Sequence, residues 1–139
     1  MEEKEFDLLQ EHSLIFLEMA FRTDKHESVK NPDGYGKKAS SCGDIVEIFL
    51  SVLNDHIDSV SLQIRGCMNI NACANVIAHM AEGKNLEEAW GISPETVFNY
   101  LQTLPPTHFH CAEMAVGAFH AALASHQENR RNPWKKLYR

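Results

Sequence analysis

Two neighbouring segments of the chain alternate apolar and polar residues, which is the pattern of a β-strand with one buried face. They are DIVEIFLSVL, residues 44–53, and SVSLQIRG, residues 59–66, and NDHID between them is typical of a hairpin turn. The apolar face comprises Val46, Ile48, Leu50, Val52, Val60, Leu62 and Ile64. An antiparallel pair with one apolar face needs a cover, so the rest of the chain has to supply helices that pack on it.

Helical periodicity is present on both sides of this hairpin. Apolar residues near helical spacing predict an N-terminal helix over about residues 6–21. After Cys67, apolar residues recur at steps of three and four until Gly83. This spacing predicts an amphipathic helix that carries Cys73 on its buried stripe.

Two shorter helices and one long helix are predicted in the remaining part of the chain. Asn85 with Glu88 resembles a capping box, and Ser93 followed by proline supplies an N-cap and an N1 proline. The last helix is expected to begin near His110, which puts Cys111 in its first turn.

The order of helix, sheet and helices predicts an α+β fold, with a small antiparallel β-sheet of two to three strands packed by about four to five helices. Residues 35–40, in the turn-rich stretch that begins at Asn31, supply the optional third strand.

A chain of 139 residues is about one domain, so residues 1–139 are expected to form a single domain. The basic segment over about residues 129–139 is expected to be a loosely held tail.

Charge and hydropathy exclude several functional classes. The formal net charge of −6 argues against a nucleic-acid surface. The longest apolar runs are shorter than the roughly 18 residues that a membrane span needs. The first residues, MEEKEFD, are acidic where a secretory signal would be basic, so we expect a cytoplasmic protein with reduced thiols and with neither nucleic acid nor membrane as a partner.

Three of the four cysteines lie next to groups that suit metal binding or thiol chemistry. Cys42 and Asp44 are two residues apart, so both side chains would point to the same side if a strand begins there. Cys67 opens a helix, and Cys111 with His110 opens the last helix, where the helix dipole favours a thiolate. These residues could hold a thiophilic metal, but their wide spacing along the chain does not by itself bring them together.

A plainer interpretation stands beside the chemical one. Cysteine is among the most often buried residue types, so each cysteine taken alone is expected in the core, and Cys73 keeps that interpretation. Asp44 and His110 could be solvated residues at the start of an element, and His108 is expected to face water. The other histidines are expected on solvated faces or in turns, without a ligand role: His12, His26, His56, His79, His120 and His126.

Taken in order, the motifs SCGD, GC before a helix, LPP, and HC before a second helix resemble the iron–sulfur cluster assembly scaffold family of the IscU/NifU N-terminal type. The resemblance covers roughly residues 31–127. It implies a single scaffold domain with a small antiparallel sheet, and a site at one end that holds iron and an iron–sulfur cluster, expected to be [2Fe–2S]. The implied site residues are Cys42, Cys67 and Cys111 as cluster ligands, with Asp44 and His110 as additional polar residues, one of which is the expected fourth ligand.

Two stretches depart from the family pattern. MNINAC follows the second cysteine in place of small residues, and Thr107-His108 follow LPP where the chaperone-recognition motif of the family reads LPPVK. Use of a dedicated Hsp70 chaperone therefore stays open. No further cysteine-rich domain follows, so a full-length multidomain NifU is not expected.

The resemblance implies a scaffold rather than an enzyme, which receives sulfur and iron and passes the cluster to acceptor apoproteins. Thiolates are the usual cluster ligands, and one harder oxygen or nitrogen ligand leaves the cluster less securely held. A cysteine desulfurase would donate sulfur as a persulfide, with Cys111 preferred to Cys67 and Cys42 as the acceptor. A homo-oligomer is compatible with this function.

Two other functional classes are left open. The same ligands would hold Zn²⁺ tetrahedrally, so the protein as isolated could contain zinc, or the chain could be a structural or regulatory zinc protein. A thiol enzyme that uses Cys111 with His110 or His108 is disfavoured, because neighbouring residues of a helix point about 100° apart.

Two more roles are expected for charged residues. Asp44 is a hard, exchangeable ligand beside soft thiolates, so it is expected to govern release of the cluster rather than its formation. The tail is a candidate docking surface for a partner, with a solvated tail as the alternative. Its basic residues are Arg130, Arg131, Lys135 and Lys136.

Overall fold

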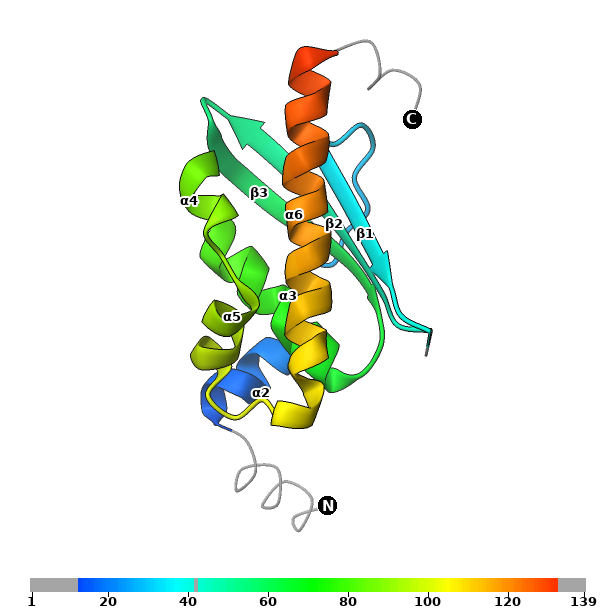
Figure 1. Ribbon diagram of the computed structural model, residues 1–139, viewed down its shortest axis with the longest axis vertical. Coiled ribbons are helices and arrows are strands. Elements are labelled where there is room, and N and C mark those ends of the chain that lie inside the picture. Colours follow the sequence, from blue (N-terminus) through cyan, green and yellow to red (C-terminus); the bar gives the residue numbers. More distant parts are fainter. Residues whose placement is uncertain (1–12, 42, 133–139) are drawn as a thin grey trace.

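The computed structural model describes residues 13–41 and 43–132. In chain order, its elements are α2 (Leu14–Phe21), β1 (Gly34–Ala39), β2 (Ile45–Leu53), β3 (His56–Arg65), α3 (Met68–Ala81), α4 (Leu86–Trp90), α5 (Pro94–Leu101), η1 (Pro106–His108) and α6 (Phe109–Arg131). The strands form one sheet, and helices cover one of its faces (Figure 1). The predicted α+β fold, a small antiparallel sheet packed by helices, is confirmed.

The sheet has the strand order β1-β2-β3, and both strand pairs are antiparallel. In the central strand β2, the alternating residues Val46, Ile48 and Leu50 are at most 1% exposed. Leu62 and Val60 of β3 lie opposite Ile48 and Leu50, and they are buried to the same extent. The alternation that the sequence shows is therefore the inner face of the sheet, and β1 is the third strand that the sequence left optional.

The turn between β2 and β3 is shorter than predicted. The sequence suggests a turn over residues 54–58, whereas β3 begins at His56. Asn54 and Asp55 form the turn with positive φ values of 54° and 61°, as in the two-residue turns whose twist matches that of the flanking strands. The strand therefore includes Ile57, whose side chain is 0% exposed and belongs to the core.

Helix α6 packs across the inner face of the sheet, mostly over β1 and also over β2 (Figure 1). Two glycines of β1 allow this close approach. A Cβ on Gly34 would overlap the carbonyl oxygen of Ala122, and a Cβ on Gly36 would overlap backbone atoms of Ala118 and Ala122. Glycine inside a strand often marks such an approach of another backbone.

Helix α3 lies in the centre of the helical layer and contacts β3, α2, α5 and α6. Its Asn75 is 0% exposed. The Nδ2 amide of Asn75 donates to the carbonyl oxygens of Met19 at 2.7 Å and Arg22 at 3.0 Å. Because a buried amide needs hydrogen-bond partners, these bonds fix the end of α2 against α3.

The predicted N-terminal helix is described only in its second half. Residues 6–21 are the predicted range, whereas α2 begins at Leu14, and residues 6–12 lie outside the described residues. Ser13 is extended, and its Oγ accepts a hydrogen bond from the Phe16 N–H at 3.1 Å. A serine in this conformation is an N-cap, so it marks the start of the helix.

The last helix ends later than predicted. Helix α6 has 23 residues and continues to Arg131, so the first residues of the predicted tail are helical. Asn129 is 7% exposed and donates to the Asp33 carbonyl oxygen at 3.1 Å, which holds this end on the body. Residues 133–139 lie outside the described residues.

Among the helices that the structure describes, none has both the length and the apolar character that crossing a bilayer requires.

The two short helices begin where the sequence predicts. The Oδ1 atom of Asn85 accepts from the Glu88 N–H at 2.8 Å, and its Nδ2 donates to the Glu88 carboxylate at 2.7 Å. Ser93 Oγ accepts from the Thr96 N–H at 3.2 Å. Both predicted N-caps are confirmed, and α4 and α5 extend the helical layer along α6.

Candidate functional site

The predicted site residues that the structure describes lie at the ends of three elements. Asp44 directly precedes β2, Cys67 is the N-cap of α3, and Cys111 lies in the first turn of α6. A Cβ on Gly66 would lie 3.0 Å from Asp44 Oδ1, so this carboxylate lies beside the residue that precedes Cys67. The Cys111 thiol lies close enough to Cys67 and Asp44 for the charges of these residues to raise its pKa. The fold therefore brings these three residues together.

A tight turn joins β1 to β2 at this site. The Ser40 N–H donates to the Asp44 carbonyl oxygen at 2.9 Å, and the Asp44 N–H donates to Ser40 Oγ at 3.1 Å. Gly43 has a φ of 93°, which glycine adopts readily. Cys42 lies outside the described residues, and β2 begins only at Ile45. Asp44 is thus a turn residue, and the argument that it shares a strand face with Cys42 does not hold.

Cys67 is exposed at the start of α3. Its carbonyl oxygen accepts from the Asn71 N–H at 3.2 Å and from Asn71 Nδ2 at 3.1 Å. The sulfur lies where the unpaired N–H groups and the dipole of a helix favour an anion. Sequence reasoning overlooked Asn71 as a residue that secures this turn, although an asparagine four residues after the cysteine is a recognisable signal.

Cys111 is 1% exposed. Burial raises the pKa of Cys111 to about 12, and the charges of Cys67 and Asp44 and a hydrogen bond with Cys67 act in the same direction. Groups that become negative at such short range disfavour each other's ionised forms. A bound cation has the opposite effect, because thiolates and carboxylates are its ligands. This donor set fits a thiophilic metal ion.

His110 is exposed, and its Nε2 lies 3.7 Å from Cys111 Sγ. Adjacent helical residues point about 100° apart, which disfavours a base next to its nucleophile, but the long imidazole side chain of His110 still reaches the Cys111 sulfur. The ring of His110 also stacks on that of His108, with centroids 5.8 Å apart, and His108 is partly buried instead of facing water.

The described part of the site is not a preformed metal centre. Within residues 13–41 and 43–132, no three histidine, cysteine or carboxylate side chains form a group that could hold a metal ion as they stand. Cys42 is the one predicted ligand outside these ranges.

The fourth cysteine lies in the core, as predicted. Cys73 is 0% exposed, and burial raises its pKa well above the usual range, with smaller contributions from Cys111 and Cys67. A thiol of this kind packs as a small apolar side chain.

Several histidines lie in other surroundings than predicted. His126 is 8% exposed, because it follows Ala122 by one helical turn on the face of α6 that covers the sheet. His120 Nε2 lies 3.0 Å from the Ile92 carbonyl oxygen, and its ring packs on Trp90. His26 Nε2 is buried as well. His56 and His79 are exposed as predicted, and His12 lies outside the described residues.

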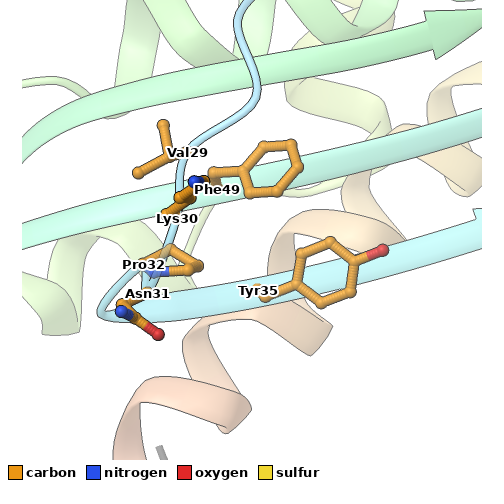
Figure 2. A pocket seen from close by; sticks show the side chains of 6 residues that line it. All are labelled: Val29, Lys30, Asn31, Pro32, Tyr35 and Phe49. Atoms are coloured by element: carbon orange, nitrogen blue, oxygen red, sulfur yellow. The ribbon is translucent and has the colours of Figure 1, made fainter. Parts of the chain in front are cut away.

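A cavity on the outer face of the sheet is separate from the cysteines. Its volume is about 510 Å³. Tyr35 and Phe49 lie opposite each other on β1 and β2, and their ring centroids are 5.2 Å apart. The Tyr35 hydroxyl donates to the Glu47 carboxylate at 2.5 Å, and burial with this hydrogen bond raises the pKa of Tyr35 to about 12. The lining residues, shown in Figure 2, are Val29, Lys30, Asn31, Pro32, Tyr35 and Phe49.

Comparison with known proteins gives consistent matches. The family described as NifU-like N terminal domain matches residues 22–133. The iron-sulfur cluster assembly scaffold protein IscU 1 of Archaeoglobus fulgidus is 30% identical over 99 residues, which cover 70% of this chain and 65% of that protein. The chain thus spans less than two thirds of this relative. IscU of Escherichia coli K12 is 31% identical over 94 residues, covering 66% and 72% of the two chains.

Solved structures show the same fold at low sequence identity. A candidate iron-sulfur cluster assembly scaffold protein for the SUF system from Fervidobacterium islandicum AW-1 superposes with a TM-score of 0.70 at 20% identity, covering 82% of this chain and 97% of that one. The N-terminal part of a NifU-like protein from Brucella abortus gives 0.70 at 14% identity, covering 84% and 94%.

Proposed function

The chain belongs to the NifU-like N-terminal domain family, and from this premise we propose that it is a scaffold on which iron–sulfur clusters are assembled. The cluster is then cargo, which is built on the chain and handed to acceptor apoproteins. Relatives named as iron-sulfur cluster assembly scaffold proteins support this function. The observation that carries the proposal is the proximity of Cys67, Cys111 and Asp44 at the ends of three elements.

Cys42, Cys67 and Cys111 are the proposed thiolate ligands, with Asp44 or His110 as the fourth ligand. Thiolates are the normal ligands of iron–sulfur clusters. A carboxylate or an imidazole is a harder ligand and exchanges more readily.

Sulfur is proposed to arrive from a cysteine desulfurase as a persulfide. The Cys111 thiolate attacks the outer sulfur of the donor persulfide, a new sulfur–sulfur bond forms on Cys111, and the donor leaves as a thiolate. This exchange has no net oxidation or reduction. Release of the sulfur as sulfide then takes two electrons from an external reductant. The His110 imidazole, 3.7 Å from Cys111 Sγ, is placed to accept the thiol proton.

Two properties of the cysteines bear on the choice of acceptor in opposite directions. Cys67 is exposed at a helix N-terminus, which favours access and the thiolate form. Cys111 is buried, but it has the imidazole of His110 beside it. Mass spectrometry after incubation with a desulfurase and cysteine decides between them. We expect a mass increase of one sulfur in the Cys67→Ser variant and none in the Cys111→Ser variant.

Anaerobic reconstitution tests the function itself. The full chain is incubated with ferrous iron, cysteine and a desulfurase, and iron, acid-labile sulfide and visible absorption are then measured. We expect iron and sulfide in equal amounts, a strong loss of both in the Cys67→Ser variant, and no loss in the matched control Cys73→Ala. A wild-type chain that binds Zn²⁺ but takes up no sulfide would overturn the proposal and favour a zinc protein that uses the same ligands.

A further inference from the structure

The C-terminal end of α6 lies between two cavities. One is the outer-face cavity of Figure 2, which Pro32 lines. Asn129 near the end of α6 donates to the carbonyl oxygen of the next residue, Asp33, so this cavity is close to the end of the helix. The other lies on the opposite side of the helix, has a volume of about 450 Å³, and is called here the α4 groove. The α4 groove is lined by Asp55, Asn85, Leu86, Glu87, Trp90, Gln127 and Arg130.

The α4 groove combines an apolar wall with an acidic rim. Leu86 and Trp90 are partly buried and pack against the core, and the Trp90 ring packs on His120 at a centroid distance of 5.2 Å. The rim carries the carboxylates of Asp55 and Glu87. Asp55 pairs with Arg130 at 2.8 Å, whereas Glu87 forms no ion pair within the described part of the chain. Aromatic apolar surface rimmed by charge is typical of a binding surface.

The residues that follow α6 have matching chemistry. Asn132 is the C-cap of α6, and the next residues in the sequence are Pro133, Trp134, Lys135 and Lys136. Two extended residues beyond Asn132 reach roughly 7 Å, which is about the rise of α6 from Gln127 to Asn132. Trp134 is therefore within reach of the α4 groove.

Charge distinguishes the two cavities. The outer-face cavity is lined by the ammonium group of Lys30 and by no carboxylate. The α4 groove is lined by two carboxylates and one guanidinium. A segment with consecutive lysines is repelled by the first cavity and attracted by the second. We propose that residues 133–136 of this chain fold back into the α4 groove, with the Trp134 indole against Leu86 and Trp90 and a lysine beside Glu87.

This contact would cover the partly exposed side chains of Leu86 and Trp90. An indole against leucine and tryptophan side chains removes apolar area from water and allows favourable ring packing. The lysine–Glu87 pair adds a solvent-exposed attraction, which corresponds to roughly a two- to fivefold change in the docked population. It should weaken as the ionic strength increases.

Nuclear Overhauser effects in the isotope-labelled full chain at low salt test the proposal. We expect cross-peaks from the Trp134 indole to the Leu86 methyl groups, and loss of these peaks when the chain is ended at Asn132. Glu87→Lys should reduce their intensity roughly two- to fivefold. Glu27→Lys is the matched control, because Glu27 is exposed and undergoes the same charge change away from the groove; it should leave the peaks unchanged.

Three results would overturn the inference. Absence of cross-peaks between Trp134 and Leu86 in the wild-type chain excludes docking. Chemical-shift changes on truncation that centre on Tyr35 and Phe49 place the segment in the other cavity. Cross-peaks found only between labelled and unlabelled chains in an isotope-filtered spectrum assign the groove to a second copy instead.

Discussion

The two halves of α6 lie in contrasting surroundings. In the C-terminal half, polar groups have partners: Ser125 accepts from the Tyr35 N–H, Asn129 donates to the Asp33 carbonyl oxygen, and Arg130 pairs with Asp55. In the first turn, the buried thiol of Cys111 lies with Cys67 and Asp44, and the charges of these neighbours oppose its ionisation. The polar groups named for the C-terminal half thus have protein partners, whereas the neighbours of Cys111 disfavour its thiolate form.

We expect this difference to separate variants that mainly affect stability from variants that mainly affect the proposed binding of cargo. Local choices in a sequence usually agree with the fold, and exceptions are expected at functional sites. Variants in the C-terminal half should therefore affect unfolding more than cargo binding, and variants in the first turn should do the reverse.

The largest effect is expected where β1 approaches α6. In Gly36→Val, the new side chain overlaps backbone atoms of Ala118 and Ala122, which cannot move aside as a flexible side chain could. We expect a loss of about 3 kcal/mol in the free energy of unfolding, measured by urea denaturation. Lys37→Val, which introduces the same residue at an exposed neighbouring position, is the control and should change stability little. Equal losses in both variants would contradict this packing argument.

In the first turn of α6, a substitution is expected to reduce cargo binding and to change the free energy of unfolding only slightly. Cys111→Ala removes one proposed thiolate ligand, so the iron and sulfide retained after reconstitution should fall by about tenfold. The free energy of unfolding should change by no more than about 1 kcal/mol, because only one sulfur atom is removed from the core. A variant that keeps its cluster but unfolds easily would reverse the contrast between the two halves.

Asp44→Ala should have a more limited consequence. The three cysteines can still bind a cluster, but the exchangeable carboxylate is lost, so transfer to an acceptor should become about threefold slower. Visible absorption follows the transfer from reconstituted wild type and variant to an apo-ferredoxin. Equal or faster transfer from the variant would mean that Asp44 is an ordinary turn residue.

The smallest effect concerns pH and the Tyr35–Glu47 pair. The folded-state pKa of Tyr35 is raised from 10 to about 12, by burial and by Glu47, so its stabilising contribution is present below pH 10 and is lost as the pH rises toward 12. Solvent screening of this partly exposed pair limits the contribution to about 0.5 kcal/mol. Denaturation at pH 9 and pH 11 should show a steeper loss for wild type than for Tyr35→Phe. Parallel curves would remove Tyr35 as the source.

The sequence predicts local features of the fold well. The alternation around Ile48 and Leu62 identifies the sheet and its inner face, and Asn85 and Ser93 identify two helix starts. These features depend on neighbours in the chain. The burial of His126 was missed because it depends on the close approach of α6 to β1, which two glycines of the strand permit and periodicity does not reveal.

The candidate site could be predicted only in part. Cys67 and Cys111 are recognised at helix starts, but they are 44 residues apart, and only tertiary structure brings them into contact. The expected strand geometry at Asp44 was wrong, because hydrogen bonds with Ser40 make this segment a turn. The family resemblance supplied the grouping that spacing alone could not.

The close contact between α6 and β1 also has a consequence for synthesis of the chain. Gly36 meets Ala118 and Ala122 across more than 80 intervening residues, so the ribosome makes all three strands long before the helix that covers them. Contacts of such high sequence separation form slowly, and uncovered apolar strands are prone to aggregate in the meantime. Until α6 emerges, the nascent polypeptide exposes the inner face of its sheet, so a chain interrupted before residue 109 should depend on chaperones to stay in solution.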